Sequence, residues 1–360
     1  MLQLQNISIL QFRNYTGRTF SFTERVTGIC GSNGSGKTNL LDAIYYLSFT
    51  KSYLTRPDSQ NVHHGLLGMR LEGNYTLNEE KQKLVSILRE NNKKEFSVNG
   101  DEYKKFSEHI GRFPCVMIAP DDAELITGGS EERRKFVDTI LSQINKEYLQ
   151  HLIDYTKILQ QRNSVLKQAA EKGKPDEVLF EILTEQLSQK GEFIHAIRKE
   201  FLQSFLPVAQ DYYKQIAGKD DEVTLVYESD LDKGNMKTLL ANSRQKDFIL
   251  QRTTIGTHRD DVTAKMAGAT FKTEASQGQR KSLLFALKLA EWQTLKEAKG
   301  FTPILLLDDV FEKLDEQRMR NLLNWVCSDT DGQIFITDTH AERLAKALDA
   351  IEVKHGLIEL

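Results

Sequence analysis

Few cysteines and no long apolar run occur in this sequence. Only Cys30, Cys115 and Cys327 are present among 360 residues, far apart and without a second Cys or His at metal-ligand spacing, which argues against a disulfide framework and a zinc site. The longest aliphatic run, Ile304 to Leu307, is far shorter than the roughly 18 to 20 residues that cross a bilayer. The first residues carry no basic leader and no apolar segment before a cleavage site, so we expect a cytoplasmic protein without a membrane span.

An excess of charge of one sign is also missing. The chain has 48 Lys+Arg against 51 Asp+Glu, a net charge of -3 and 39% hydrophobic residues. These values are typical of a globular protein of two domains or one enlarged domain, and they exclude a disordered chain. Such a balance is unusual for a protein that coats nucleic acid by overall charge, so any nucleic-acid binding must come from local basic patches.

A phosphate-binding loop is the strongest motif, and it lies between an apolar strand at 26–30 and a helical run at 39–47. The pattern G-x-x-x-x-G-K-[ST] is formed by Gly31, Ser32, Asn33, Gly34, Ser35, Gly36, Lys37 and Thr38. Its glycines let backbone N–H groups curl around phosphate oxygens, and the following helix adds partial positive charge at its N-terminus. We expect Lys37 to reach the β- and γ-phosphates of a nucleotide and Thr38 to hold Mg²⁺.

A metal-binding acid is expected at the end of a neighbouring strand. Residues 303–307 are a near-continuous aliphatic run typical of a buried parallel strand, and Asp308 and Asp309 follow it. We predict that Asp308 holds the metal and that Asp309 orients or deprotonates an attacking water. Because the Asp309 side chain is one methylene shorter than the glutamate common in fast ATPases, we expect slow hydrolysis.

The spacing of these two motifs predicts a split domain. Roughly 270 residues separate Lys37 from Asp308, which is too many for one compact P-loop domain. From Ser130 the sequence turns helical, breaks at 172–175 and continues in a second helical pattern to about 216, which indicates an antiparallel hairpin or a small helical domain. We predict an α/β fold with a β-rich N-terminal lobe at 1–123, an inserted helical domain at 124–245 and a C-terminal lobe at 246–360.

A second possible phosphate contact precedes a long helix expected at 280–299. It is formed by Ser276, Gln277, Gly278 and Gln279, which offer a hydroxyl and free N–H groups at a helix start. An ordinary N-cap is the alternative, and for the tetrapeptide alone it is the better one. The position of the tetrapeptide shortly before the strand that ends at Asp308 favours a functional role.

In this order the motifs resemble the signature, Walker B and D-loop (Leu314-Asp315) of the ABC-type ATPases, specifically their SMC-like branch. Within that branch the chain resembles the RecF family over residues 12 to 315. Further matching segments are Phe12-Arg13-Asn14-Tyr15, Lys51-Ser52-Tyr53, Arg133-Arg134-x-Phe136-x-Asp138, Gly256-x-His258-Arg259-Asp260-Asp261 and Ala286-Leu287-Lys288-Leu289-Ala290. The chain departs from the family pattern at Asp42 (usually Glu), Thr257 and Ser130 (usually Pro) and Glu312-Lys313 (usually Ser-Glu), and none of these removes a phosphate or metal ligand.

The resemblance implies an ABC-type ATPase head that binds ATP with Mg²⁺ and closes into a head-to-tail homodimer. Ser276 and Gly278 would then contact the γ-phosphate held at Lys37 of the opposite protomer, and Asp315 would border the shared interface. Arg13, Asn14 and Asn39 would line the nucleotide site. His340, which follows a strand at 334–337, would sense the γ-phosphate, or it would be an exposed histidine at a helix start.

By the same resemblance, the expected function is recombinational DNA repair and replication. A slow, DNA-stimulated ATPase would dimerise on double-stranded DNA or gap junctions, associate with the nucleoid, and help RecO and RecR to load the RecA recombinase. The alternative is a nucleotide-gated DNA clamp or scaffold of the SMC type whose turnover only resets it. No motif shows DNA binding, but four basic clusters could face a DNA backbone: Lys93-Lys94, Lys104-Lys105, Arg133-Arg134-Lys135 and Arg280-Lys281.

Overall fold

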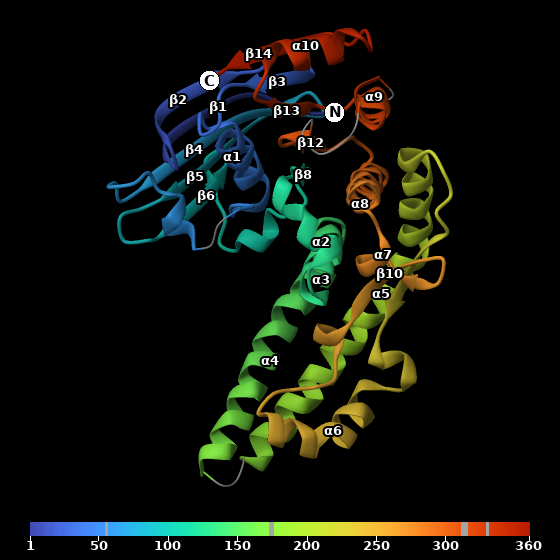
Figure 1. The fold of residues 1–360 in the computed structure, drawn as a ribbon. Coiled ribbons are helices and arrows are strands. Elements are labelled where there is room, and N and C mark those ends of the chain that lie inside the picture. The colour runs from blue at the N-terminus through green and yellow to red at the C-terminus, as the bar shows by residue number, and fades with distance from the viewer. Residues whose placement is uncertain (55–56, 173–175, 311–315, 329–330) are drawn as a thin grey trace. The chain divides into compact units, whose positions relative to one another are not determined.

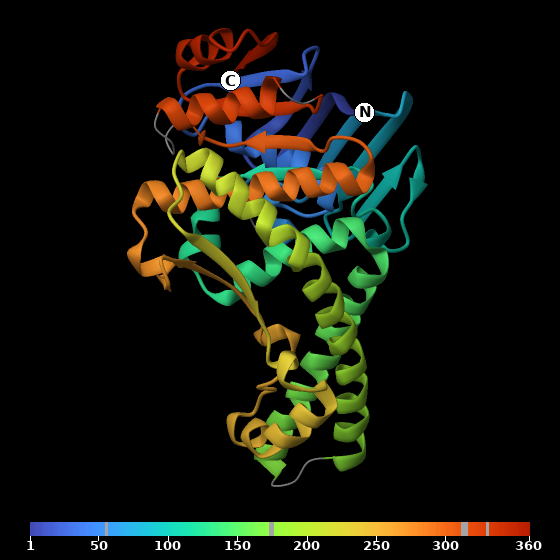
Figure 2. The same cartoon turned by 90° about the vertical axis from the view of Figure 1, so that its right-hand side faces the viewer.

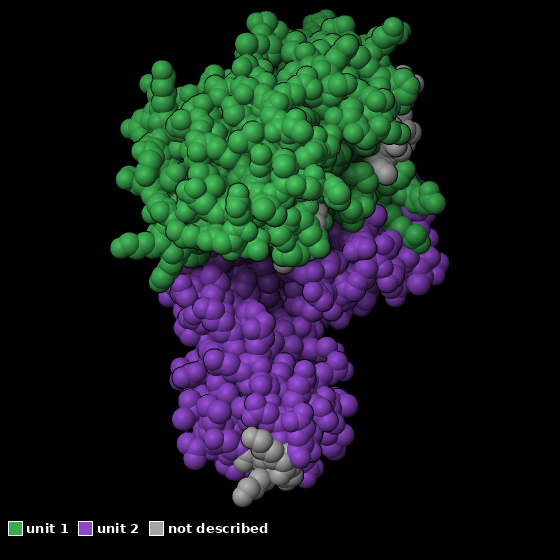
Figure 3. Space-filling model, turned by 90° about the vertical axis from the view of Figure 1, so that its left-hand side faces the viewer, with its two compact units in different colours: residues 1–122, 215–218, 277–360 green, residues 123–214, 219–276 purple. Residues whose placement is uncertain are grey.

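The protein forms two compact units, each described here by itself (Figure 3). The computed structural model describes residues 1–54, 57–172, 176–310, 316–328 and 331–360. Unit 1 comprises residues 1–122, 215–218 and 277–360, and unit 2 comprises residues 123–214 and 219–276. Unit 1 is therefore discontinuous in sequence, and the whole of unit 2 is inserted between its two main segments.

A parallel five-stranded sheet forms the centre of unit 1, in the order β14-β3-β13-β12-β8. Its strands β3, β8, β12 and β13 are buried along their whole length, as expected for parallel strands covered on both faces. The order places the strand before the phosphate loop and the strand before Asp308 on either side of β13. The strands are β3 (Val26–Cys30), β8 (Cys115–Ile118), β12 (Ile304–Leu307), β13 (Ile334–Asp338) and β14 (His355–Glu359).

An antiparallel six-stranded sheet, in the order β2-β1-β4-β5-β6-β7, forms the rest of the first lobe. Residues 84–88 of β5 pair antiparallel with residues 94–98 of β6, with Leu84 opposite Val98. Asn99 and Gly100 both have positive φ, 55° and 94°, and make the tight turn that continues into the next strand. The strands are β1 (Leu2–Phe12), β2 (Tyr15–Ser21), β4 (Met69–Leu77), β5 (Glu80–Leu88), β6 (Lys94–Val98) and β7 (Asp101–Glu102).

Helix α1 (Lys37–Phe49) contacts strands of both sheets and is almost entirely buried (Figure 1). Its apolar residues share one core with both sheets, for example Leu41 and Ile44 with Leu71 and Leu306. Because the phosphate loop ends at the start of this helix, the core fixes where that loop sits. Unit 1 also contains α8 (Gln277–Lys299), α9 (Glu316–Leu323) with the π-helical turn Asn324–Ser328, and α10 (Ala341–Asp349).

The long helices of unit 2 run antiparallel, as Figures 1 and 2 show for α4 (Lys146–Lys172) and α5 (Glu177–Ala217). The rings of His151 and Phe193 stack at 3.9 Å, and farther along Arg162 Nε donates to Thr184 Oγ1 at 3.0 Å. Residue numbers rise on one helix as they fall on the other, so these contacts establish the antiparallel arrangement. The remaining helices of unit 2 are α2 (Ala123–Thr127), α3 (Ser130–Ile144), α6 (Met236–Leu250) and α7 (Phe271–Glu274). No helix among the described residues is both long and apolar enough to span a membrane.

One helical break was not expected from the sequence. Asn145 has extended backbone, with φ -132° and ψ 105°, and it separates α3 from α4. Its side-chain Oδ1 accepts a hydrogen bond from Tyr148 N at 2.9 Å. An asparagine can satisfy a helix N-terminus in this way, so a new helix begins there without a glycine or proline.

Unit 2 extends to Ser276, whereas the sequence placed the end of the insert at 245. The reason is a three-stranded sheet, β11-β10-β9, that pairs Val226 with Thr263 across the expected boundary. Its strands are β9 (Val223–Glu228), β10 (Asp261–Met266) and β11 (Ala269–Thr270). Backbone pairing between distant short segments leaves no local pattern, so the sequence alone does not indicate this sheet.

Candidate nucleotide site

The phosphate loop has the backbone geometry that its glycines predict. Gly34 and Gly36 have φ of 81° and 110°, a region that residues with a Cβ rarely adopt. A Cβ on Gly36 would lie 2.7 Å from Asn14 Nδ2 and 2.9 Å from Tyr15 Oη. The loop is tied to the turn between β1 and β2, because Tyr15 Oη donates to Gly36 O at 3.0 Å and Asn14 Nδ2 donates to Ser35 O at 3.2 Å.

Lys37 begins α1 and turns its ammonium back over the loop. Its Nζ donates to the carbonyl oxygens of Gly31 at 2.8 Å and Ser32 at 3.1 Å, and the side chain is buried. Asn39, two residues further along the chain, donates from Nδ2 to Asn14 Oδ1 at 2.8 Å. A fixed positive charge and a helix N-terminus therefore meet at one loop, which is the arrangement that binds phosphate.

Asp308 and Thr38 meet although about 270 residues separate them in sequence. Thr38 Oγ1 donates to the Asp308 carboxylate, 3.0 and 2.9 Å from its two oxygens, and Thr337 Oγ1 of β13 donates to Oδ1 at 2.8 Å. Burial raises the pKa of Asp308, and the hydroxyls of Thr337 and Thr38 limit that rise.

The Thr38 hydroxyl and the Asp308 carboxylate fit a magnesium ion, because Mg²⁺ prefers oxygen ligands and usually takes few from the protein. No cluster of three or more His, Cys, Asp or Glu side chains that could hold a metal occurs in the part of the chain that the structure describes. The remaining ligands of such an ion would have to be phosphate oxygens and water.

Asp309 is held in an uncommon backbone conformation. Its φ is 46°, in the left-handed region that costs energy for most residues and is found often at functional sites. Its backbone N–H donates to Thr337 Oγ1 at 2.8 Å, and that hydroxyl in turn donates to Asp308. One threonine of β13 thus fixes both acids. Asp315 lies outside the described residues.

His340 lies at the N-terminus of α10, just beyond β13. Its side chain is 71% exposed, and its Nδ1 is 2.8 Å from Thr339 Oγ1. The backbone beneath it is held by Asp338, whose carboxylate accepts from His340 N at 3.0 Å and from Arg343 Nε at 2.9 Å. His340 is therefore an exposed histidine on a fixed backbone at the same edge of the sheet as the loop and Asp308.

Arg13, which the resemblance places at the nucleotide site, pairs with α1 and with the loop that follows it. Its guanidinium turns to the buried side of α1, where Nη2 lies 2.8 Å from Asp42 Oδ2 and 2.9 Å from Ser52 Oγ. Burial raises the pKa of Asp42, and the Arg13 charge opposes that rise. Sequence reasoning noted Asp42 only as a departure from the family and missed Tyr15 as a support of the loop. Nothing local in the sequence indicates either contact.

The tetrapeptide at 276–279 lies at the start of α8, as expected. Ser276 and Gln277 are exposed, and Gly278 and Gln279 are partly exposed. A Cβ on Gly278 would lie 2.7 Å from Arg318 Nη1, so a glycine is needed for that arginine to approach the backbone. Ser276 ends unit 2, and Gln277 begins the last segment of unit 1.

Two of the four basic clusters that could face DNA form ion pairs within the protein. In unit 2, Arg133 donates from Nε and Nη2 to Asp261 at 2.6 and 2.9 Å, and Lys135 pairs with Glu131 and Glu132. In unit 1, Lys94 Nζ lies 2.7 Å from Asp58. By contrast, Lys104 and Lys105 are exposed.

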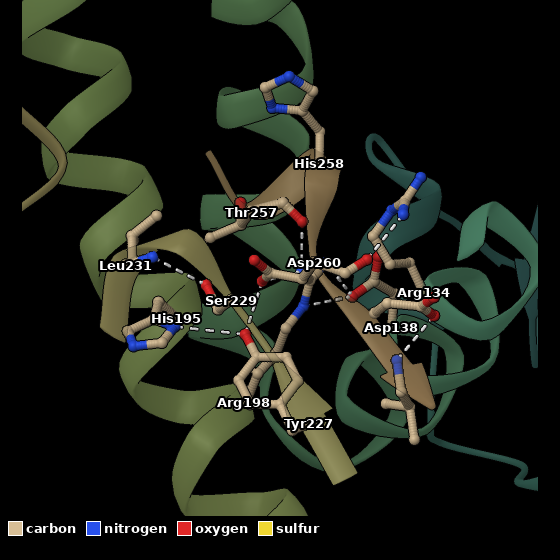
Figure 4. A network of polar contacts seen from close by, with 12 residues as sticks. Arg134, Asp138, His195, Arg198, Tyr227, Ser229, Leu231, Thr257, His258 and Asp260 are labelled. Atoms are coloured by element: carbon tan, nitrogen blue, oxygen red, sulfur yellow. Dashed lines mark hydrogen bonds and ion pairs between the residues drawn. The ribbon is translucent and has the colours of Figure 1, made fainter. Parts of the chain in front are cut away.

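A buried network in unit 2 accounts for the two arginine- and aspartate-rich motifs (Figure 4). Arg198 of α5 lies 2.8 Å from Asp138 and 3.0 Å from Asp260, and it also donates to Thr257 O and Tyr148 Oη. Burial lowers the pKa of His258 to about 4, so this histidine is a neutral structural group. The network joins α3, α4 and α5 to the start of β10.

The whole chain matches known proteins. The model of the family described as RecF/RecN/SMC N terminal domain matches residues 3–357. The chain is 42% identical over 342 residues to the DNA replication and repair protein RecF of Flavobacterium johnsoniae, covering 95% of each chain. It is 41% identical over 357 residues to that of Parabacteroides distasonis, covering 99% of this chain and 97% of the relative.

Solved structures show the same fold. The recombination mediator protein RecF in the RecFOR pathway, solved as RecF-ATP, superimposes with a TM-score of 0.86 at 31% identity, covering 94% of this chain and 92% of that chain. The Smc head domain from Pyrococcus furiosus, with an extended coiled coil and bound to the C-terminal domain of ScpA, superimposes with a TM-score of 0.55 at 15% identity, covering 96% and 92%. At that identity the likeness shows the fold alone.

Proposed function

The chain belongs to the RecF family, with an ABC-type ATPase head of mixed α/β fold, and from that premise we propose that it is an ATP-dependent DNA-binding protein of recombinational repair and replication. The observation that carries the proposal is the contact of Thr38 and Asp308 beside the Lys37 ammonium. It supports ATP binding with Mg²⁺, because it joins a phosphate-binding loop to a metal-binding acid.

ATP acts in this proposal as the link between two copies of the chain. Lys37, Thr38 and the loop N–H groups of one protomer bind the phosphates, and Ser276 and Gly278 of the other protomer contact the γ-phosphate. Mg²⁺, when bound, neutralises phosphate charge. Because ATP then binds the dimer far more tightly than the monomer, it shifts the equilibrium toward the dimer.

Hydrolysis in this proposal is slow and is stimulated by DNA. Asp309 follows β12, and its backbone is held by Thr337 of β13. Its carboxylate orients or deprotonates the attacking water. Loss of the γ-phosphate removes the contact that Ser276 makes in trans, so the dimer separates. His340 senses the γ-phosphate from its exposed position at the edge of the sheet.

DNA and protein partners are proposed from the relatives. The names of the relatives include DNA replication, repair and the RecFOR pathway. They support double-stranded DNA or gap junctions as the ligand and RecO and RecR as partners. They also support RecA loading as the outcome and a cytoplasmic, nucleoid-associated location. Since the chain has a net charge of -3, the DNA affinity must come from weak patches that the dimer brings together.

DNA retention measured at several salt concentrations tests this function. With ATP and Mg²⁺ we expect the affinity for double-stranded DNA to rise at least about tenfold over that with ADP, and to fall steeply from 50 to 200 mM salt because phosphate contacts release counterions. Equal retention with ATP, ADP and no nucleotide would contradict the proposal. DNA retention could require ATP while a variant that does not hydrolyse ATP still supports repair. That result would favour the nucleotide-gated scaffold instead.

A further inference from the structure

A second charged cluster lies inside unit 1, away from the phosphate loop. Lys288 and Glu291 of α8 are only 8% and 4% exposed, and Asp122, at the end of the turn after β8, is 10% exposed. Charged groups are costly to bury unless they are paired. Packing alone therefore does not explain why three charged side chains are buried in the ATPase unit.

Lys288 lies between the other two charges. Its Nζ is 3.3 Å from Tyr53 Oη, 3.6 Å from Glu291 Oε2 and 3.9 Å from Asp122 Oδ2. The Tyr53 hydroxyl donates to Asp122 Oδ1, and the other oxygen of Asp122 accepts from Ala119 N at 2.8 Å. The cluster thus ties α8 to the loop after α1 and to the turn after β8.

The contacts continue from this cluster to the nucleotide-binding helix. Tyr53 N donates to Asp42 Oδ1 at 2.7 Å, and Asp42 lies on α1, one turn after Lys37. Asp42 also pairs with Arg13, next to the asparagine that supports the phosphate loop. A continuous row of buried polar contacts therefore leads from α1, which begins at Lys37, to α8, which begins at Gln277.

We propose that Lys288, Asp122 and Tyr53 are positioning residues that couple the nucleotide-binding helix α1 to α8, so that nucleotide bound at Lys37 sets the position of Gly278 for a second protomer. This inference rests on the proposed function. Asp122 is also the last residue of unit 1 before the chain enters unit 2.

Glu291 gives the coupling a dependence on pH. Burial raises its pKa to about 7, Lys288 opposes the rise and Asp122 adds to it. Its Oε2 lies 3.6 Å from Lys288 Nζ and has no partner within hydrogen-bond distance among the described residues. The other ionisable groups that face it are Tyr53, Tyr45 and Cys115. Below pH 7 Glu291 is neutral, and the Lys288 ammonium interacts mainly with Asp122 and Tyr53. Above pH 7 Glu291 is ionised and also attracts the Lys288 ammonium. Coupling is therefore stronger on the acidic side.

The test compares ATP binding with ATP-dependent dimerisation. Lys288→Met/Glu291→Gln removes both charges of α8, and Asp122 keeps the hydrogen bonds from Tyr53 Oη and Ala119 N. We expect the monomer of this variant to bind ATP within about threefold of wild type, while the ATP concentration for half-maximal dimerisation rises at least about tenfold. Lys288→Arg, which keeps the positive charge, should dimerise at an ATP concentration within about threefold of that of wild type. Lys296→Met, on the same helix and partly exposed, is the matched control.

A second variant keeps the test independent of folding. For Glu291→Gln, the ATP concentration for half-maximal dimerisation at pH 8 should equal that of wild type at pH 6. It should not change between pH 6 and pH 8. The inference is overturned if the double variant dimerises like Lys296→Met, if ATP binding and dimerisation fall together, or if Glu291→Gln keeps the pH profile of wild type. Failure of wild type itself to dimerise with ATP would instead contradict the proposed function, and this inference with it.

Discussion

An Asp309→Asn variant is expected to hydrolyse ATP at least about 100-fold more slowly than wild type, and to remain a dimer on DNA long after wild type has dissociated. The carboxylate that orients or deprotonates water would be lost, and a positioned general base contributes about 10² to 10⁴ in rate. The backbone of Asp309 is held by Thr337, so the amide keeps the conformation at φ 46°. Asparagine tolerates that region better than most residues.

Single-turnover hydrolysis and ATP binding measured together check this result. ATP affinity should change less than about threefold, because Lys37, Thr38 and Asp308 keep their contacts. Asp121→Asn, an exposed acid beyond the neighbouring strand β8, is the control and should behave as wild type. Hydrolysis by Asp309→Asn at a rate close to that of wild type would exclude Asp309 as the residue that acts on water.

Replacing Arg198 by Met in unit 2 is expected to lower the free energy of unfolding of that unit by roughly 3 to 5 kcal/mol, the cost of breaking a buried ion pair from one side. Asp260, 1% exposed, and Asp138 would lose the guanidinium that lies 3.0 and 2.8 Å away. Burial already raises the pKa of Asp260, and the Arg198 charge opposes that rise. Without Arg198 the pKa rises further, so the loss of stability should be complete above the new pKa and smaller in acid, where Asp260 is protonated.

Urea unfolding followed by two signals separates this effect from general damage. The two tryptophans, Trp292 and Trp325, lie in unit 1, whereas much of the far-UV circular dichroism comes from the long helices of unit 2. The dichroism midpoint should fall and the fluorescence midpoint should stay. Lys199→Met, the exposed neighbour paired with Asp232 at 2.5 Å, should cost less than about 1 kcal/mol. Equal losses from the two variants would show that the Arg198 network does not stabilise unit 2.

Much of the nucleotide site could be predicted because its parts have local patterns. The apolar strand, glycine loop and helix at 26–49 are contiguous, and the aliphatic strand before Asp308 ends in its acid. Since the carboxyl ends of the parallel strands of one sheet lie at the same edge, the meeting of Thr38 and Asp308 followed from these patterns. The contact is now seen at 2.9 Å.

Features that depend on distant partners could not be predicted. Arg13 pairs with Asp42 and Ser52. Arg133, which belongs to a basic cluster that could face DNA, pairs with Asp261. A charge in a sequence does not show its partner, and neither pair is close in sequence. The pairing of β9 with β10, which carries unit 2 as far as Ser276, was missed for the same reason.

The central claim is that ATP joins two copies of this chain through Ser276, and sedimentation velocity tests it most directly. Wild type is predicted to be a monomer without nucleotide or with ADP, and a dimer with ATP and Mg²⁺ under conditions that slow hydrolysis. A Ser276→Arg variant is predicted to bind ATP as wild type does and to remain a monomer, because the bulky side chain blocks the γ-phosphate of the partner. Wild type that stays monomeric with ATP, or a Ser276→Arg variant that dimerises as readily as wild type, would contradict the account.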